Sequence, residues 1–224
     1  MIVRATRRDQ RVEFVLVDQE SPKELPWAII NAFAADLAEL NKVREHLGQN
    51  AFVARTFVRT LFSIFDSYSW FLKHRAMDGA ANASVQFTEK ELEIIHEERS
   101  KTFEDATSKI VPKIVPTKEN LLFSIRAYAR VRHVEAPLVS NALPPEFHIA
   151  NDVRNRITHP KSAADFAISA NELRAIGMLL VWFGSLATWA SHEEQKTTDE
   201  LIERNRQTFA EARERHDQAR RKQD

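Results

Sequence analysis

Apolar side chains recur at steps of three and four residues along residues 50–76, which is the spacing of one face of an α-helix. They belong to Val53, Phe57, Leu61, Ile64, Phe65, Tyr68, Phe71 and Leu72. A helix with an apolar face this wide must bury it against other elements of the fold. The chain contains only four glycines and eight prolines, too few for a protein rich in tight turns. The sequence therefore predicts an all-α protein.

Further helices are predicted on both sides of this one. They are expected to begin near Ser21, after the capping box of Thr88 and Glu91, at residue 118, near Pro145, and at residue 170 after the capping box of Ser169 and Glu172. The last helix is expected to end near residue 194 and to be buried, because the apolar run at 175–190 falls short of a membrane span. Two prolines make residues 109–117 extended or turning.

The chain is expected to have three parts. Residues 1–20 form a hairpin appendage, because apolar and polar residues alternate around a polar middle. Residues 21–195 form the helical domain. Residues 196–224 hold eight basic and seven acidic residues and almost nothing to bury, which predicts a charged, exposed helix or a disordered tail.

The composition excludes several classes of function. Lys and Arg together number 32, as do Asp and Glu, so any binding of nucleic acid must come from a local patch. The absence of cysteine excludes a disulfide framework, a thiolate zinc site and a cysteine nucleophile. Residues 1–10 lack the apolar segment of a signal peptide. We therefore expect a cytoplasmic protein without a metal, another cofactor or a membrane partner.

The stretch "NDVRNRITHPK" at residues 151–161 concentrates polar side chains near the end of a predicted helix. An apolar stripe of Ile149, Val153 and Ile157 is expected to face the core. At about 100° per residue, the exposed side then carries Arg154, Asn155, Thr158 and His159. Because Pro160 disfavours helix in the residue before it, His159 should lie at the helix C-terminus, where the helix dipole favours the protonated imidazole.

These residue types suit the cleavage of RNA without a metal ion. A guanidinium binds a phosphate oxygen, and an imidazole takes a proton from a hydroxyl. The 2′-hydroxyl of RNA is the internal nucleophile and leaves a 2′,3′-cyclic phosphate end. We hypothesise that His159 is the general base, that Arg154 stabilises the phosphorane, and that Asn155 orients the histidine.

The string Arg154-Asn155-x-x-x-His159 resembles the Arg-x(4–6)-His motif of the HEPN superfamily of all-helical domains, in which a polar residue directly follows the arginine. The resemblance covers roughly residues 21–195 and implies a HEPN-like helical bundle. It also implies a homodimer in which two motifs face each other. The function implied is a metal-independent endoribonuclease of a toxin–antitoxin or anti-phage defence system, acting on single-stranded RNA, with an antitoxin or defence protein as a partner.

Two other groups of residues are candidates for supporting roles. Asp66 resembles an acidic or polar residue of some HEPN proteins; it can orient His159, pair with Arg154, or simply lie at the edge of its helix. A second group shares a helix face and can either hold an RNA backbone or form a solvated basic surface. Its members are Arg126, Arg130 and His133, with Arg132 nearby.

The motif also has a structural interpretation. Arg154 can pair with a carboxylate and His159 can simply finish a helix, which would make the chain a non-catalytic binding or dimerisation module. The bulky Arg156 inside the motif is a candidate for packing or for a salt bridge.

A single motif is expected to be a poor active site. Two residues five positions apart on a helix project about 140° apart, so Arg154 and His159 of one chain do not converge on one atom. A two-fold axis beside the exposed face would bring two motifs together. We therefore predict an isologous dimer with residues 154, 155, 158 and 159 lining a polar groove at the axis.

Overall fold

A computed structural model describes residues 2–8, 11–17, several positions between 32 and 43, and the ranges 50–102 and 108–221. The described chain is mostly helical, as the sequence predicted. The expected hairpin is present, with β1 (Ile2–Arg8) antiparallel to β2 (Arg11–Val17) and Ile2 opposite Val17. Most of the helix predicted to begin near Ser21 lies outside the described residues.

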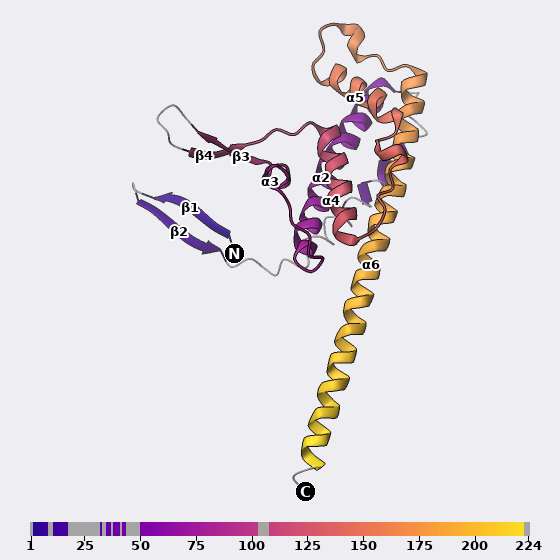
Figure 1. Cartoon of the computed structure of the whole chain (residues 1–224). Coiled ribbons are helices and arrows are strands. Elements are labelled where there is room, and N and C mark those ends of the chain that lie inside the picture. The colour runs from indigo at the N-terminus through magenta and orange to yellow at the C-terminus, as the bar shows by residue number, and fades with distance from the viewer. Residues whose placement is uncertain are drawn as a thin grey trace.

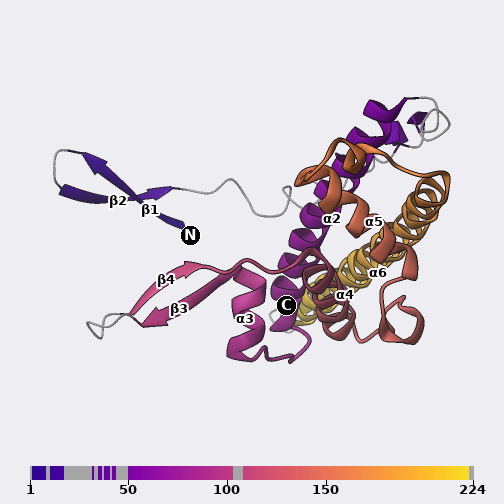
Figure 2. The ribbon, with the colours of Figure 1, turned by 90° about the horizontal axis from the view of Figure 1, so that it is seen from above.

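The longest predicted apolar stripe forms α2 (Ala51–Ala80). Asn50 caps this helix by accepting hydrogen bonds from the backbone N–H groups of Phe52 and Val53 at 2.9 and 3.3 Å, which satisfies two of the unpaired donors at its N-terminus. α4 (Thr117–Arg132) packs along α2, while α5 (Pro145–Thr158) packs against the first half of α6 (Ala170–Arg221). Figures 1 and 2 show these helices gathered into one bundle.

The core of the bundle is aromatic. The ring of Phe65 lies between α5 and α6, with its centroid 5.8 Å from that of Phe147 and 4.8 Å from that of Phe183. Phe62 joins them at 5.3 Å from Phe65, and Tyr68 lies 5.1 Å from Phe183. All five side chains are buried, so the face predicted for residues 50–76 is the face that holds the bundle together.

A second hairpin projects from the bundle and was not predicted as such (Figure 2). Its strands are β3 (Glu98–Thr102) and β4 (Ser108–Pro112), which are antiparallel and follow α3 (Glu89–His96). The capping box of Thr88 and Glu91 is confirmed at the start of α3. Residues 109–112 are extended, as the prolines indicated, but the polar partner strand carried no recognisable strand pattern.

A buried lysine ties this hairpin to the bundle. The ammonium group of Lys73 on α2 is inaccessible to solvent and donates to the Ile94 carbonyl at 3.1 Å, to Glu97 at 2.6 Å and to Asn120 at 3.0 Å. Its three donors are therefore all satisfied, as a buried cation requires. Because Glu97 lies directly before β3, this contact joins the base of the hairpin to α2.

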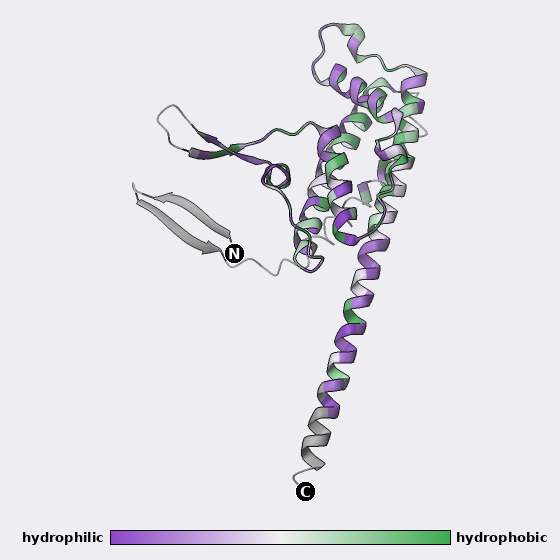
Figure 3. Cartoon of the chain, viewed as in Figure 1, coloured by the Kyte–Doolittle hydropathy of each residue, from purple (hydrophilic) through white to green (hydrophobic). Residues whose placement is uncertain are grey.

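The capping box of Ser169 and Glu172 is confirmed, but α6 runs to Arg221 and not only to residue 194. At 52 residues it is roughly 78 Å long and extends beyond the bundle (Figures 1 and 3), with exposed side chains at residues 201–211. Among the described residues, the segment Ala170–Glu211 of α6 is long and apolar enough to cross a membrane. The core helices of soluble proteins can have the same length and composition.

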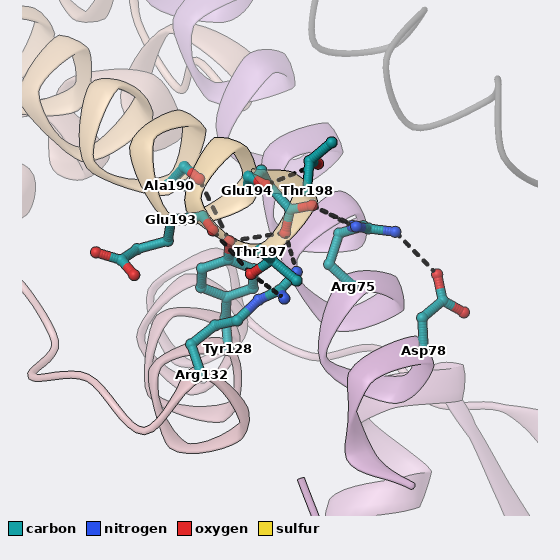
Figure 4. A network of polar contacts seen from close by, with 9 residues as sticks. All are labelled: Arg75, Asp78, Tyr128, Arg132, Ala190, Glu193, Glu194, Thr197 and Thr198. Carbon is teal, nitrogen blue, oxygen red and sulfur yellow. Dashed lines mark hydrogen bonds and ion pairs between the residues drawn. The ribbon is translucent and has the colours of Figure 1, made fainter. Parts of the chain in front are cut away.

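One carboxylate anchors α6 at the point where it leaves the bundle (Figure 4). Glu194 is 2% exposed and accepts hydrogen bonds from the guanidinium groups of Arg75 on α2 and Arg132 on α4. The Tyr128 hydroxyl also donates to it, at 2.7 Å. Burial raises the pKa of this carboxyl, but the hydrogen bond and charge of Arg75 and the charge of Arg132 outweigh burial and lower it.

Candidate functional site

The helix that carries the motif packs by a different stripe from the one predicted. Phe147, Ala150, Val153 and Ile157 are the buried residues of α5. Ile149 is 44% exposed, so its assignment to the core stripe was wrong. A strict step of four residues advances by about 40° beyond a full turn each time, so Ile149 lies about 80° away from Ile157. Steps of three and four residues together keep the stripe on one face.

Arg154 extends from α5 towards α2. Its side chain is half-buried, and its guanidinium carbon lies 5.8 Å from the centre of the Phe62 ring. Its Nη1 atom donates a hydrogen bond to Asn155 Oδ1 at 3.1 Å. Within the described part of the chain this is the one hydrogen bond of the Arg154 side chain, so its other N–H groups remain available to a ligand.

Arg154 and Asp66 line the same cleft, which has a volume of about 780 Å³. Burial in the cleft raises the pKa of the Asp66 carboxyl, while the Thr117 hydroxyl and the positive charge of Arg154 oppose that rise. No direct ion pair joins these two described residues. Asp66 and Arg154 therefore share the cleft, whereas His159 is not part of its lining.

His159 is at the C-terminal cap of α5, as predicted. Its backbone N–H donates to the Asn155 carbonyl at 2.9 Å, and its exposed imidazole does not line the cleft. The Asn155 side-chain oxygen accepts a hydrogen bond from Arg154. Thr158 is exposed, and its hydroxyl donates to the Arg154 carbonyl at 2.6 Å. Arg154 thus lines the cleft, and His159 does not.

Arg156 forms the salt bridge for which it was a candidate in the sequence. It forms an ion pair with Glu172 at the start of α6 at 3.0 Å, and it donates to the carbonyls of Asp165 and Ala167 at 3.2 and 2.7 Å. These contacts fasten the segment after the motif to α6. Neither Arg154 nor His159 takes part in these contacts of Arg156.

The basic group on α4 is largely engaged with other parts of the chain. Arg126 donates to the Asn141 carbonyl at 2.6 Å, and Arg130 forms an ion pair with Glu91 at 2.9 Å. Arg132 belongs to the Glu194 network, and His133 is the left-handed cap residue of α4. These contacts reduce the positive charge that this face can offer to a phosphate backbone.

Two contributors to the site were not singled out from the sequence. Arg59 on α2 donates from Nη2 to the Ile157 carbonyl at 2.8 Å, which satisfies a terminal carbonyl of α5 two residues before His159. Trp70, also on α2, lines the cleft that contains Arg154. Helical spacing placed both residues on α2, but no local pattern indicates which distant segment each one meets.

No group of three or more His, Asp or Glu side chains is arranged to hold a metal ion among the residues that the structure describes. Comparison of the chain with protein-family models, curated proteins and solved structures finds no match.

Proposed function

We propose that this protein is a metal-independent endoribonuclease of the HEPN type, which acts as a homodimer on single-stranded RNA. The observation that carries the proposal is the position of Arg154. A half-buried guanidinium lines a cleft, while the same helix presents the exposed imidazole of His159 at its end. A cation beside a cleft and a nearby proton acceptor are the two groups that this chemistry requires.

In this mechanism His159 removes the proton of a ribose 2′-hydroxyl. The 2′-oxygen forms a bond to phosphorus, Arg154 stabilises the additional negative charge on the phosphorane, and the bond to the 5′-oxygen of the next nucleotide breaks. The same His159, protonated by the first step, can return the proton to that oxygen. The products are a 2′,3′-cyclic phosphate and a 5′-hydroxyl.

A shared site is supported by the position of Arg154 in the lining of the cleft and of His159 outside that lining. A two-fold axis beside α5 would place the arginine of one protomer opposite the histidine of the other. The interaction between Arg154 and Asn155 fits this arrangement, because Asn155 then holds the arginine towards the cleft. Such an activity suits a toxin or an anti-phage defence component.

The test is an incubation of the purified protein with single-stranded RNA in EDTA. We expect ends with 2′,3′-cyclic phosphate, and we expect Arg154→Ala and His159→Ala to abolish them. Arg174→Ala and His148→Ala are matched controls, because both residues are exposed and lie outside the cleft. Intact RNA after incubation with the wild-type protein would refute the proposal.

Mixing the two inactive variants tests the shared site. After subunit exchange, a heterodimer of Arg154→Ala and His159→Ala keeps one arginine and one histidine on different chains, so cleavage should return in part. Light scattering across a dilution series checks that the protein is a dimer. If the folded, dimeric variants recover no activity, the site is not shared.

A second candidate function is a non-catalytic binding or dimerisation module. It is favoured by the internal contacts of Arg126, Arg130 and Arg132, which leave little free positive charge on α4. RNA cleavage that is insensitive to both motif substitutions, or no cleavage at all, would support this alternative.

A further inference from the structure

The cleft beside Arg154 is formed by segments that are far apart in the sequence. α2 contributes Asp66 and Trp70, the connection from β4 to α4 contributes residues 112–117, and α5 contributes Arg154. Its volume of about 780 Å³ lies in the range of pockets that hold small ligands. The cleft is therefore large enough to take one nucleotide.

Most polar groups around the cleft are already used within the protein. Lys113 forms an ion pair with Glu93 at 2.9 Å. Glu97 is neutralised by the buried Lys73 at 2.6 Å, and the Asn120 Oδ1 atom accepts from the same ammonium group. Asp66 and Arg154, in contrast, make no direct ion pair with any described residue. The Asp66 carboxyl interacts with the Thr117 hydroxyl, and Arg154 donates to Asn155 Oδ1. A carboxylate accepts several hydrogen bonds and a guanidinium has five N–H donors, so both groups keep capacity for a ligand.

The rest of the cleft lining combines the hydroxyl groups of Ser67 and Thr117 with apolar side chains, of which Trp70 is aromatic. The centroid of the Trp70 ring lies 3.9 Å from that of His74, so one side of the indole is supported by a second ring. Ile114, on the connection from β4 to α4, is 94% exposed. Unstacked bases of single-stranded RNA stack on aromatic side chains, while polar groups form hydrogen bonds with the edges of the bases.

We propose that this cleft binds a guanine base of single-stranded RNA, with Asp66 accepting hydrogen bonds from its N1–H and N2–H groups, Trp70 contacting its ring and Arg154 holding the adjacent phosphate. The inference rests on the proposed function, because it takes RNA as the substrate. It adds a base-selective subsite and names Asp66 as the residue that determines specificity.

The preference for guanine follows from the chemistry of a carboxylate. An ionised carboxylate only accepts hydrogen bonds. Guanine offers two adjacent donors on its Watson–Crick edge and can therefore make a bidentate contact. Adenine and cytosine each place a ring nitrogen acceptor beside their amino group, and uracil places a carbonyl on both sides of its single N–H. These acceptors would face the negative charge of Asp66.

Binding is measured separately from cleavage by using the His159→Ala protein. Fluorescence anisotropy at one fixed salt concentration compares the labelled RNAs UUGUU, UUAUU and UUUUU. A bidentate contact predicts that UUGUU binds roughly tenfold more tightly than the other two. Adding Asp66→Asn should remove this preference, whereas Glu135→Gln, which removes the same charge from an exposed residue outside the cleft, should keep it.

Adding Trp70→Leu to the same protein should weaken the binding of all three RNAs without changing their order. Equal affinity for the three RNAs, or a guanine preference that survives Asp66→Asn, would overturn the inference. The cleavage assay tests the proposed function separately. If the protein binds guanine selectively but the wild type does not cleave RNA, the subsite is supported and the catalytic proposal is refuted. If the wild type cleaves RNA but the protein shows no preference for guanine, the catalytic proposal is supported and the subsite is refuted.

Discussion

Replacing Glu194 with glutamine tests whether one buried carboxylate anchors α6 to the rest of the bundle. The substitution preserves the size of the side chain and one oxygen acceptor, but it removes the negative charge that Arg75 and Arg132 share (Figure 4). We expect the folded protein to lose stability, because two partly buried cations then lie together without a counter-charge.

The magnitude depends on which guanidinium can regain water. The Arg75 side chain is 24% exposed and also contacts Asp78 at 3.4 Å, so it keeps some compensation. The Arg132 side chain is only 11% exposed, and its Nε atom has no hydrogen-bond partner in the described structure. Removing one partner of a buried ion pair lowers the free energy of unfolding by about 3–5 kcal/mol. Because glutamine keeps one oxygen acceptor, we expect Glu194→Gln to cost about 3 kcal/mol, the low end of this range.

The assay is urea unfolding followed by circular dichroism, for the wild type and the variant, at several pH values. The pKa of a glutamate in an unfolded chain is about 4.3. Because the pKa of Glu194 is lowered in the folded state, its stabilisation is fully present above that pH and is lost as the pH falls through the folded pKa. The difference between the proteins should therefore be largest at neutral pH and shrink in acid.

Glu193→Gln is the matched control, because it removes the same charge one residue away, where the side chain points away from the network (Figure 4). It should change stability by less than about 0.5 kcal/mol. If Glu194→Gln costs no more than this control at pH 7, or if its cost does not diminish in acid, charge compensation is not what holds α6 to the bundle.

Three further substitutions test other contacts. Gly79→Ala should destabilise the protein by about 1–3 kcal/mol in urea unfolding, because a Cβ atom there would lie 2.6 Å from Val131 Cγ1; an unchanged midpoint would show that α2 and α4 can separate easily. Gly184→Ala, where a Cβ atom meets nothing within 4 Å, should instead stabilise by about 0.5–1 kcal/mol through helix propensity, and a loss would reveal a partner at that face. Arg59→Ala should cost about 1 kcal/mol and lower any RNA cleavage, because it leaves the Ile157 carbonyl near the motif without its donor; cleavage at the wild-type rate would remove Arg59 from the positioning of the site.

The local pattern of the sequence predicted most of the helices. The apolar spacing of residues 50–76 and the two capping boxes describe contacts between residues three and four positions apart, which are set within one helix. For the same reason, Pro160 was sufficient to place His159 at the end of α5. The positions of Arg154, Asn155 and Thr158 along that helix also follow from local spacing.

The tertiary structure decided what those side chains meet. The hairpin of β3 and β4 was missed because its first strand is polar. Glu97, the residue before that strand, contacts Lys73, which lies 24 positions earlier in the sequence. The cleft beside Arg154 depends on how α2, α5 and residues 112–117 lie next to one another. Periodicity specifies which face of a helix is buried, but it does not specify which distant segment covers that face. The local sequence therefore determined the helices and the position of the motif along α5, while packing between distant segments directed Arg154 into a cleft and left His159 outside it.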